Sequence, residues 1–161
     1  MKKLKRLFLV LIFLIAGCSV NAIYHDEDKA IEDSNLFLKA LIKEDFAAAY
    51  LQISDRLKQS VPLERFKSDL KLSLEQRGTI EKAVFDSFQA VPGQMAIQLY
   101  YNVFHRDAKN ILYHFVLEGD GKTGYKIVVF DIGNQMPYPP NMKYIGVNRI
   151  KKDKLIEVVG D

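Results

Sequence analysis

The fold of this chain is decided by the stretch QMAIQLYYNVFHR, residues 94–106, in which apolar side chains recur at every second position. One series comprises Met95, Ile97, Leu99, Tyr101 and Val103, and the other comprises Gln98, Tyr100, Asn102 and Phe104. Because successive side chains of a β-strand point to opposite faces, a period of two indicates a strand whose more apolar series faces the core. The stretch therefore predicts a long strand with one buried face.

Three further segments around this strand, residues 79–91, 110–118 and 124–132, show the same alternation. Short turn segments separate them, namely residues 92–93, 105–109 and 119–121. Connections of this length join antiparallel neighbours, whereas a parallel pair needs a crossover of about a dozen residues or more. The segments therefore predict a four-stranded antiparallel meander.

The part of the chain before the meander, residues 26–78, has the apolar period of helices instead. Its breaks predict three helices, over about residues 26–43, about residues 45–58 and from Pro62 to a glycine cap at Gly78. Helices that precede strands rather than alternate with them are typical of an α+β fold. We therefore expect three N-terminal helices packed on the four-stranded sheet.

The first 18 residues have the organisation of an export signal. A basic segment, residues 2–6, precedes an apolar segment, residues 7–14, and small residues then lead to Cys18, the only cysteine of the chain. The sequence IAGC, residues 15–18, resembles a bacterial lipobox, which implies that residues 1–17 are removed and that Cys18 carries a diacylglyceryl group and an acyl chain. An apolar segment of about ten residues is too short for a bilayer, which needs roughly 20. An uncleaved anchor and an ordinary secretory signal are the alternatives.

Cleavage at this site would leave residues 18–25 as a lipid-anchored tether and would change the charge of the chain. Four of the 23 Lys and Arg precede Cys18 and none of the 20 Asp and Glu do, so the mature chain would carry a formal net charge of −1. A chain without excess positive charge gives no reason to expect nucleic acid as a partner. With Cys18 acylated, no thiol is left for a disulfide, a thiolate metal site or a nucleophile. Ser19 in place of Asp favours the outer over the inner membrane in a Gram-negative host.

The helical and strand segments together resemble the nuclear transport factor 2-like family. The stretch ALIKEDFAAAY, residues 40–50, is similar to the join of the first two helices of that family, and GYKIVVF, residues 124–130, is similar to its closing strand. Glu44 stands where the family usually has Gly, and Tyr125 where it usually has Trp. The resemblance covers residues 26–132 and implies a cone in which the sheet curls around its helices. Neither stretch is a catalytic motif, so the resemblance indicates a fold and leaves the function open.

In enzymes of this family, such as ketosteroid isomerase-like and dehydratase-like proteins, an acidic residue and a Tyr or His converge in the cavity of the cone. The candidate lining residues here are Tyr101, Tyr113, Tyr125 and Asp131. They can act together only if the strand register brings Asp131 next to a tyrosine. Aromatic residues at alternate positions of a meander are usually core packing, and the chain has no catalytic, metal-binding or cofactor-binding motif. We therefore assign no catalytic residue, no metal and no cofactor.

The opposite face of the meander is more apolar than an ordinary solvated surface. It carries Tyr100, Phe104, Leu112, His114 and Val116. Large exposed apolar patches usually mark interaction sites. We therefore expect this face to form an interface, in a homodimer or with another envelope protein, or to be covered by the chain beyond residue 133.

Residues 133–161 begin with a proline-rich connection and end with two strand-like segments, residues 143–149 and 155–159, that could form a terminal hairpin. The whole sequence predicts a lipid-anchored binding or assembly module of the cell envelope, held to the membrane through Cys18 and facing the periplasm. A carrier of a small apolar ligand and an isomerase-like or dehydratase-like enzyme are the alternatives. A filled cone would favour the assembly module. An open apolar cone would favour the ligand carrier, and an open cone with a carboxylate next to a Tyr or His would favour the enzyme.

Overall fold

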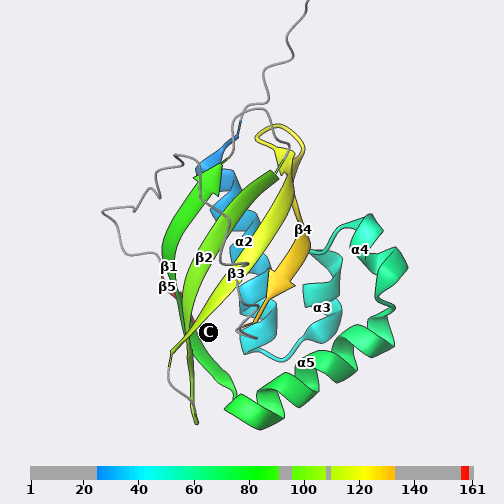
Figure 1. Cartoon of the computed structure of the whole chain (residues 1–161), viewed down its shortest axis with the longest axis vertical. Coiled ribbons are helices and arrows are strands. Elements are labelled where there is room, and N and C mark those ends of the chain that lie inside the picture. Colours follow the sequence, from blue (N-terminus) through cyan, green and yellow to red (C-terminus); the bar gives the residue numbers. More distant parts are fainter. Residues whose placement is uncertain (1–24, 91–95, 108–109, 133–156, 160–161) are drawn as a thin grey trace, which may run out of the picture.

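The computed structural model describes residues 25–90, 96–107, 110–132 and 157–159. Within these ranges four helices come first, namely α2 (Glu27–Ile42), α3 (Phe46–Leu51), α4 (Asp55–Ser60) and α5 (Leu63–Arg77) (Figure 1). The strands of the same ranges are β1 (Ile80–Ala90), β2 (Ala96–His105), β3 (Ile111–Asp120), β4 (Gly124–Asp131) and β5 (Glu157–Val159). Helices followed by strands confirm the α+β class.

The sheet is antiparallel throughout its described part, with the strand order β4-β3-β2-β1-β5. Strands β1 to β4 form the predicted meander, but a fifth strand joins it, because β5 pairs with β1 through Lys82↔Val159 and Ala83↔Val158. The first segment of the predicted terminal hairpin, residues 143–149, lies outside the described residues. An edge strand such as β1 would otherwise present unpaired backbone groups, which β5 satisfies.

The prediction of a single helix over residues 45–58 is wrong, because α3 and α4 are separate elements. The Ser54 amide donates to the Ile127 carbonyl over 2.8 Å, and the Ile127 amide donates to the Gln52 carbonyl over 3.1 Å. These bonds make a parallel bridge between Ile53 and the edge of β4. Long-range backbone bonds have replaced local helical ones, so tertiary context overrides helix propensity here.

Helix α2 begins where its sequence predicts. Asp26 caps it by accepting a hydrogen bond from the Lys29 amide over 3.0 Å. Glu44, just beyond the helix, has a φ of 54°. This left-handed conformation favours glycine and costs another residue about 1–2 kcal/mol. Glu44 thus stands at a position where glycine would be favoured.

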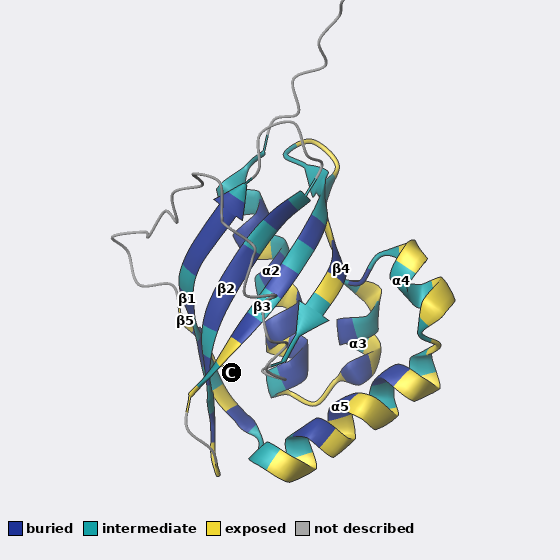
Figure 2. Ribbon diagram, in the orientation of Figure 1, coloured by how far each residue is buried: buried dark blue, intermediate teal, exposed yellow. Residues whose placement is uncertain are grey.

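One face of the sheet packs on the helices and forms the core. The more apolar series of β2 points inward as predicted, since Ile97, Leu99, Tyr101 and Val103 are fully buried. Helix α2 contacts β4 near one edge of the sheet and β1 and β5 at the other, so the sheet curves around this helix (Figures 1 and 2). The ring of Phe37 on α2 lies 5.6 Å from that of Phe115 and 5.5 Å from that of Phe130. Aromatic side chains therefore fill the space between helix and sheet.

Helix α5 packs on α3 and lies at the end of the molecule away from the start of α2 (Figure 1). Phe66 of α5 reaches the core, with its ring 5.3 Å from that of Tyr50 and 6.4 Å from that of Phe37. In the described part of the chain, no helix is both long and apolar enough to cross a membrane.

Candidate binding groove

A groove of about 430 Å³ opens between α5 and the carboxyl-terminal end of β4. Its lining comprises Val61, Phe66, Asp69, Leu70, Leu72, Ser73, Gln76, Arg77, Val129, Phe130, Asp131 and Ile132. The rings of Phe66 and Phe130 meet edge to face beneath it, with centroids 5.7 Å apart. The volume and the predominance of apolar side chains fit a small apolar ligand or a few side chains of a partner protein.

Two large apolar side chains at this groove are exposed to solvent. Phe66 and Leu70 lie on the buried face of helix α5. Leu72 lies outside this face and is 55 % exposed. On β4, Val128 is buried but Val129 is 49 % exposed. The register between β3 and β4 shifts next to these valines, and such a bulge re-aims the side chains around it. The groove therefore has an apolar rim as well as an apolar floor.

The polar residues of the groove are Asp69, Ser73, Gln76, Arg77 and Asp131. Ser73 is buried, and its hydroxyl has no hydrogen-bond partner among the described residues. A buried hydroxyl in this state costs about 1–3 kcal/mol. Arg77 also lines the groove, and its guanidinium donates to the Ile132 carbonyl and interacts with the hydroxyl of Tyr113. Among the described buried side-chain atoms of the groove, Ser73 Oγ is the one without a hydrogen-bond partner.

The predicted cavity residue Tyr101 lies in the core. It pairs across strands with Tyr113, so both rings are on the face that packs against the helices. The Tyr101 hydroxyl lies 2.7 Å from the Ser34 hydroxyl and 2.9 Å from Asn35 Oδ1. Burial raises the pKa of Tyr101 well above its ordinary value. The hydroxyl is consequently a hydrogen-bonded structural group of the α2–sheet contact.

Tyr113 joins a second buried network at the α5 end of the sheet. His105 Nδ1 lies 2.9 Å from the Gly78 carbonyl, which can only accept, so this nitrogen carries a proton. In the neutral ring Nε2 then accepts from the Tyr113 hydroxyl over 2.9 Å. Burial raises the pKa of Tyr113 to about 12, although the Arg77 guanidinium opposes the shift. The network ties the end of α5 to β2 and β3.

Tyr125 lies at the opposite end of the molecule, at the start of β4. Its hydroxyl accepts from the Asp26 amide over 2.8 Å, and its own amide donates to Asp33 Oδ2 over 2.8 Å. Burial raises the pKa of Tyr125. The His25 ring stacks on it with centroids 6.2 Å apart. Tyr125 therefore fastens the start of α2 to the sheet.

The strand register separates Asp131 from the three tyrosines. Asp131 is the cross-strand partner of His114, whereas Tyr101 and Tyr113 are partners of each other on the core face. Directly opposed residues share a face of the sheet, so Asp131 lies with His114 on the outer face. Asp131 lines the groove, but none of the tyrosines does. The structure thus does not unite the predicted cavity residues in one site.

The five predicted interface residues lie on the outer face. Tyr100 is 2 % exposed and stacks on His114 with centroids 4.7 Å apart. Gln98 Oε1 accepts from the hydroxyl of Tyr100 and from Nε2 of His114, both over 3.0 Å. Leu112 is 42 % exposed, while Phe104 and Val116 are half-buried and Phe104 contacts the Lys82 ammonium, 5.2 Å from the ring centre. The use of this face as an interface stays a prediction.

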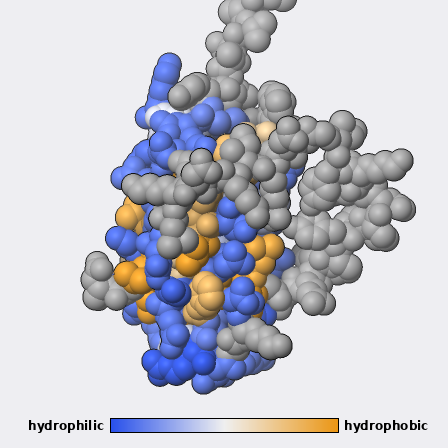
Figure 3. Space-filling view, turned by 90° about the vertical axis from the view of Figure 1, so that its left-hand side faces the viewer, coloured by the Kyte–Doolittle hydropathy of each residue, from blue (hydrophilic) through white to orange (hydrophobic). Residues whose placement is uncertain are grey.

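Apolar side chains gather around the middle of the view from the β1 side of the molecule, and the lowest part of this view is hydrophilic (Figure 3).

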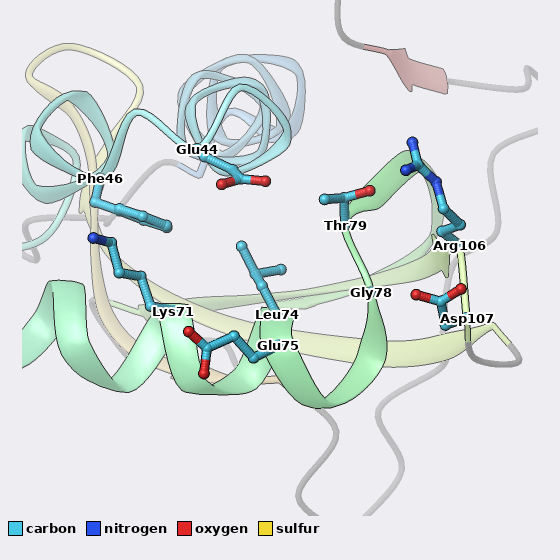
Figure 4. Close-up of a pocket in the computed structure, with 9 residues that line it drawn as sticks. All are labelled: Glu44, Phe46, Lys71, Leu74, Glu75, Gly78, Thr79, Arg106 and Asp107. Carbon is cyan, nitrogen blue, oxygen red and sulfur yellow. The ribbon is translucent and has the colours of Figure 1, made fainter.

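A polar hollow of about 430 Å³ lies between α5 and the end of β2. Glu44, Leu74 and Thr79 point into this hollow (Figure 4). Lys71, Glu75, Arg106 and Asp107 also line it. Charges of both signs are mixed there, so the hollow has no clear preference for an anion or a cation.

Within the described ranges, no group of three or more His, Cys, Asp or Glu side chains is placed to hold a metal ion. Cys18, the predicted lipidation site, lies outside these ranges. No family model matches this chain, and comparisons with curated proteins and with solved structures give no significant match. The resemblance to the nuclear transport factor 2-like family therefore stays a prediction.

Sequence reasoning missed the groove, although it left two signals. Leu72 interrupts the polar side of an amphipathic helix, and the pair Val128-Val129 breaks the alternation of β4. Either departure from the period predicts an exposed apolar side chain. Neither shows that the two positions belong to one groove, since α5 and β4 are far apart in the sequence.

Proposed function

We propose that the protein is a lipid-anchored binding module of the cell envelope whose docking site is the groove between α5 and β4. In this proposal the domain has the nuclear transport factor 2-like architecture, is anchored through lipid on Cys18, and faces the periplasm from the outer membrane of a Gram-negative host. The observation that carries the proposal is the open, largely apolar groove, with Leu72 and Val129 exposed at its rim, beside a core of buried aromatic side chains.

The burial of the predicted cavity tyrosines favours binding at the surface over carriage of a ligand inside a cone. Tyr101 is fully buried and Tyr113 is 1 % exposed, and the cluster around Phe37 occupies the space between helix and sheet. Catalysis of the isomerase or dehydratase kind needs a carboxylate next to a Tyr or His in a site that excludes water. Asp131 is the cross-strand partner of His114, but this pair lies on the outer face beside an open groove, not in a site that excludes water, and it is away from the buried tyrosines. Surface recognition is therefore the better-supported function.

The groove can be tested in the native envelope with a photo-crosslinking amino acid placed at position 72 or 129 of the full chain. The matched control is position 36, because Leu36 is 49 % exposed but lies on α2 away from the groove. We expect discrete protein adducts from the two groove positions and none from the control. Adducts to lipid alone, or equal labelling at all three positions, would contradict the proposal.

The anchor has a separate test, mass spectrometry of the mature amino terminus. We expect a chain that begins at Cys18 and carries three fatty chains, two on the diacylglyceryl group and one on the amine. More than one chain makes membrane attachment stable, whereas a single chain gives marginal binding. An unmodified Cys18 or cleavage elsewhere would refute the lipoprotein assignment.

A further inference from the structure

The groove lies at the edge of the sheet, and we infer that its occupant is an extended segment of a partner protein that adds as a strand to the end of β4. This inference rests on the proposed function, because it specifies the kind of partner that the groove takes. It follows from the backbone of β4, the side chains around the groove and the position of the groove relative to the amino terminus.

The outer edge of β4 already pairs with an extended segment at one point. β4 is the outermost strand, and in the described part of the chain its outer edge is bridged at Ile127, by residues 52–54. The strand continues beyond this bridge to Asp131, and its last residues line the groove. An edge strand of this kind is a template for a further strand. An incoming segment can therefore continue the pairing that residues 52–54 begin.

The side chains of the groove fit such a segment. Alternate side chains of a strand point the same way, so one series of an added strand would lie over the rings of Phe66 and Phe130, and the other series would lie on the outer face beside Val129. Leu72 and Val129 would each lose exposure to water against such a segment. Ser73 Oγ, which lacks a partner among the described residues, would gain an acceptor from a backbone carbonyl of the segment. Main-chain bonds would supply affinity, and the apolar pocket specificity.

The position of the groove favours a protein over the membrane as its occupant. Tyr125, at the start of β4, holds Asp26 at the beginning of α2, from which the chain leads back to Cys18. The groove is at the other end of β4, whose 8 residues span about 26 Å. The described chain therefore begins at the end of β4 opposite the groove.

The absence of Trp from the chain allows a clean binding measurement. The probe is a synthetic peptide of alternating valine and threonine that carries one tryptophan at an apolar position, titrated with the full mature chain bearing Cys18→Ser so that it cannot be acylated. We expect a saturable blue shift of tryptophan fluorescence. Leu72→Asp and Val129→Asp should each weaken binding at least tenfold, and the control Leu36→Asp should leave it unchanged.

A second peptide, N-methylated at alternate residues, separates strand addition from simple apolar contact. It has the same side chains but cannot make the ladder of backbone hydrogen bonds, so we expect at least a tenfold loss of affinity. Equal binding of both peptides would overturn strand addition while leaving the groove as a docking site. No binding of either peptide at millimolar concentration would overturn the inference, and the crosslinking test would still decide the proposed function.

Two other occupants would also overturn the inference. Binding to vesicles of phosphatidylethanolamine and phosphatidylglycerol that is lost in Leu72→Asp would make the membrane the occupant. A dimer of the Cys18→Ser chain in sedimentation that Val129→Asp dissociates would make a second copy the occupant.

Discussion

The two ends of β4 are built differently. At its start, Tyr125 is 3 % exposed, and its hydroxyl and amide bond Asp26 and Asp33 on α2. At its end, Val129 is half exposed beside a groove in which the Ser73 hydroxyl has no partner among the described residues. One strand therefore joins a sealed end, where polar groups are paired, to an open end, where apolar surface is left to water. Among the described residues, Tyr125 leaves no apolar surface for a partner at the first end, whereas the second end offers an apolar rim above a well-packed floor.

The residue at position 125 contributes directly to this difference. Tyr125 has a hydroxyl oxygen, which accepts from the Asp26 amide at the start of α2. A tryptophan could not make this bond, because an indole N–H donates but cannot accept a hydrogen bond.

The largest effect should come from truncating the floor of the groove. Phe66 is 1 % exposed and packs on Tyr50, Phe37 and Phe130, so Phe66→Ala should lower the free energy of unfolding by about 3–5 kcal/mol through lost burial and a cavity. Chemical denaturation measures the change. Leu36→Ala, at an exposed position of α2, should stay within about 0.5 kcal/mol. Equal losses in the two variants would mean that the floor is not part of the core.

Alkaline pH should destabilise the protein through the buried tyrosines. The pKa of Tyr113 is about 12 in the folded chain and about 10 in the unfolded chain. The contribution of Tyr113 to the free energy of unfolding is therefore fully present below about pH 10 and is lost as the pH rises through about 12. The loss should reach about 2–3 kcal/mol. Denaturation from pH 9 to pH 12 measures it, and Tyr113→Phe should flatten the curve. An identical pH dependence in this variant would exclude Tyr113 as the source.

At the sealed end, removing the Tyr125 hydroxyl should lower the free energy of unfolding by less than the two changes above. Tyr125→Phe leaves the Asp26 amide without its acceptor and should lower the free energy of unfolding by about 1 kcal/mol. Tyr125→Trp, which introduces the residue usual in the resembling family, should cost at least as much because it also lacks an acceptor. Denaturant midpoints of the two variants decide the point. A Trp variant as stable as the native chain would show that the bond contributes nothing.

The smallest change in the free energy of unfolding is expected at the groove, and there it should be an increase or no change. Ser73→Ala removes a buried hydroxyl that has no partner among the described residues, and should leave stability unchanged or raise it by up to about 1 kcal/mol. Ser34→Ala is the matched control, since the Ser34 hydroxyl bonds the Ile31 carbonyl over 2.9 Å and its loss should destabilise by about 1 kcal/mol. If both variants lost the same stability, the Ser73 hydroxyl would have a partner after all.

The faces of β2 illustrate what could be predicted without a structure. Alternation in residues 94–106 assigned Leu99, Tyr101 and Val103 to the core, and they are fully buried. The same alternation put Tyr100 on the outer face, where its cross-strand partner is His114. It did not indicate that Tyr100 would be 2 % exposed there. Alternation thus predicts the direction of a side chain but not what covers it.

The sequence by itself determined the types of the elements, their order and the core face of the central strand. These properties follow from periods of 3.6 and 2, which lie within single segments of chain. Only the tertiary structure decided that Ile53 would bridge Ile127 and split a helix, that β5 would pair with β1, and that Asp131 would oppose His114. It also decided that α5 and β4 would leave a groove between them. Register and grooves depend on distances between segments far apart in the chain, and such distances leave no period in the sequence.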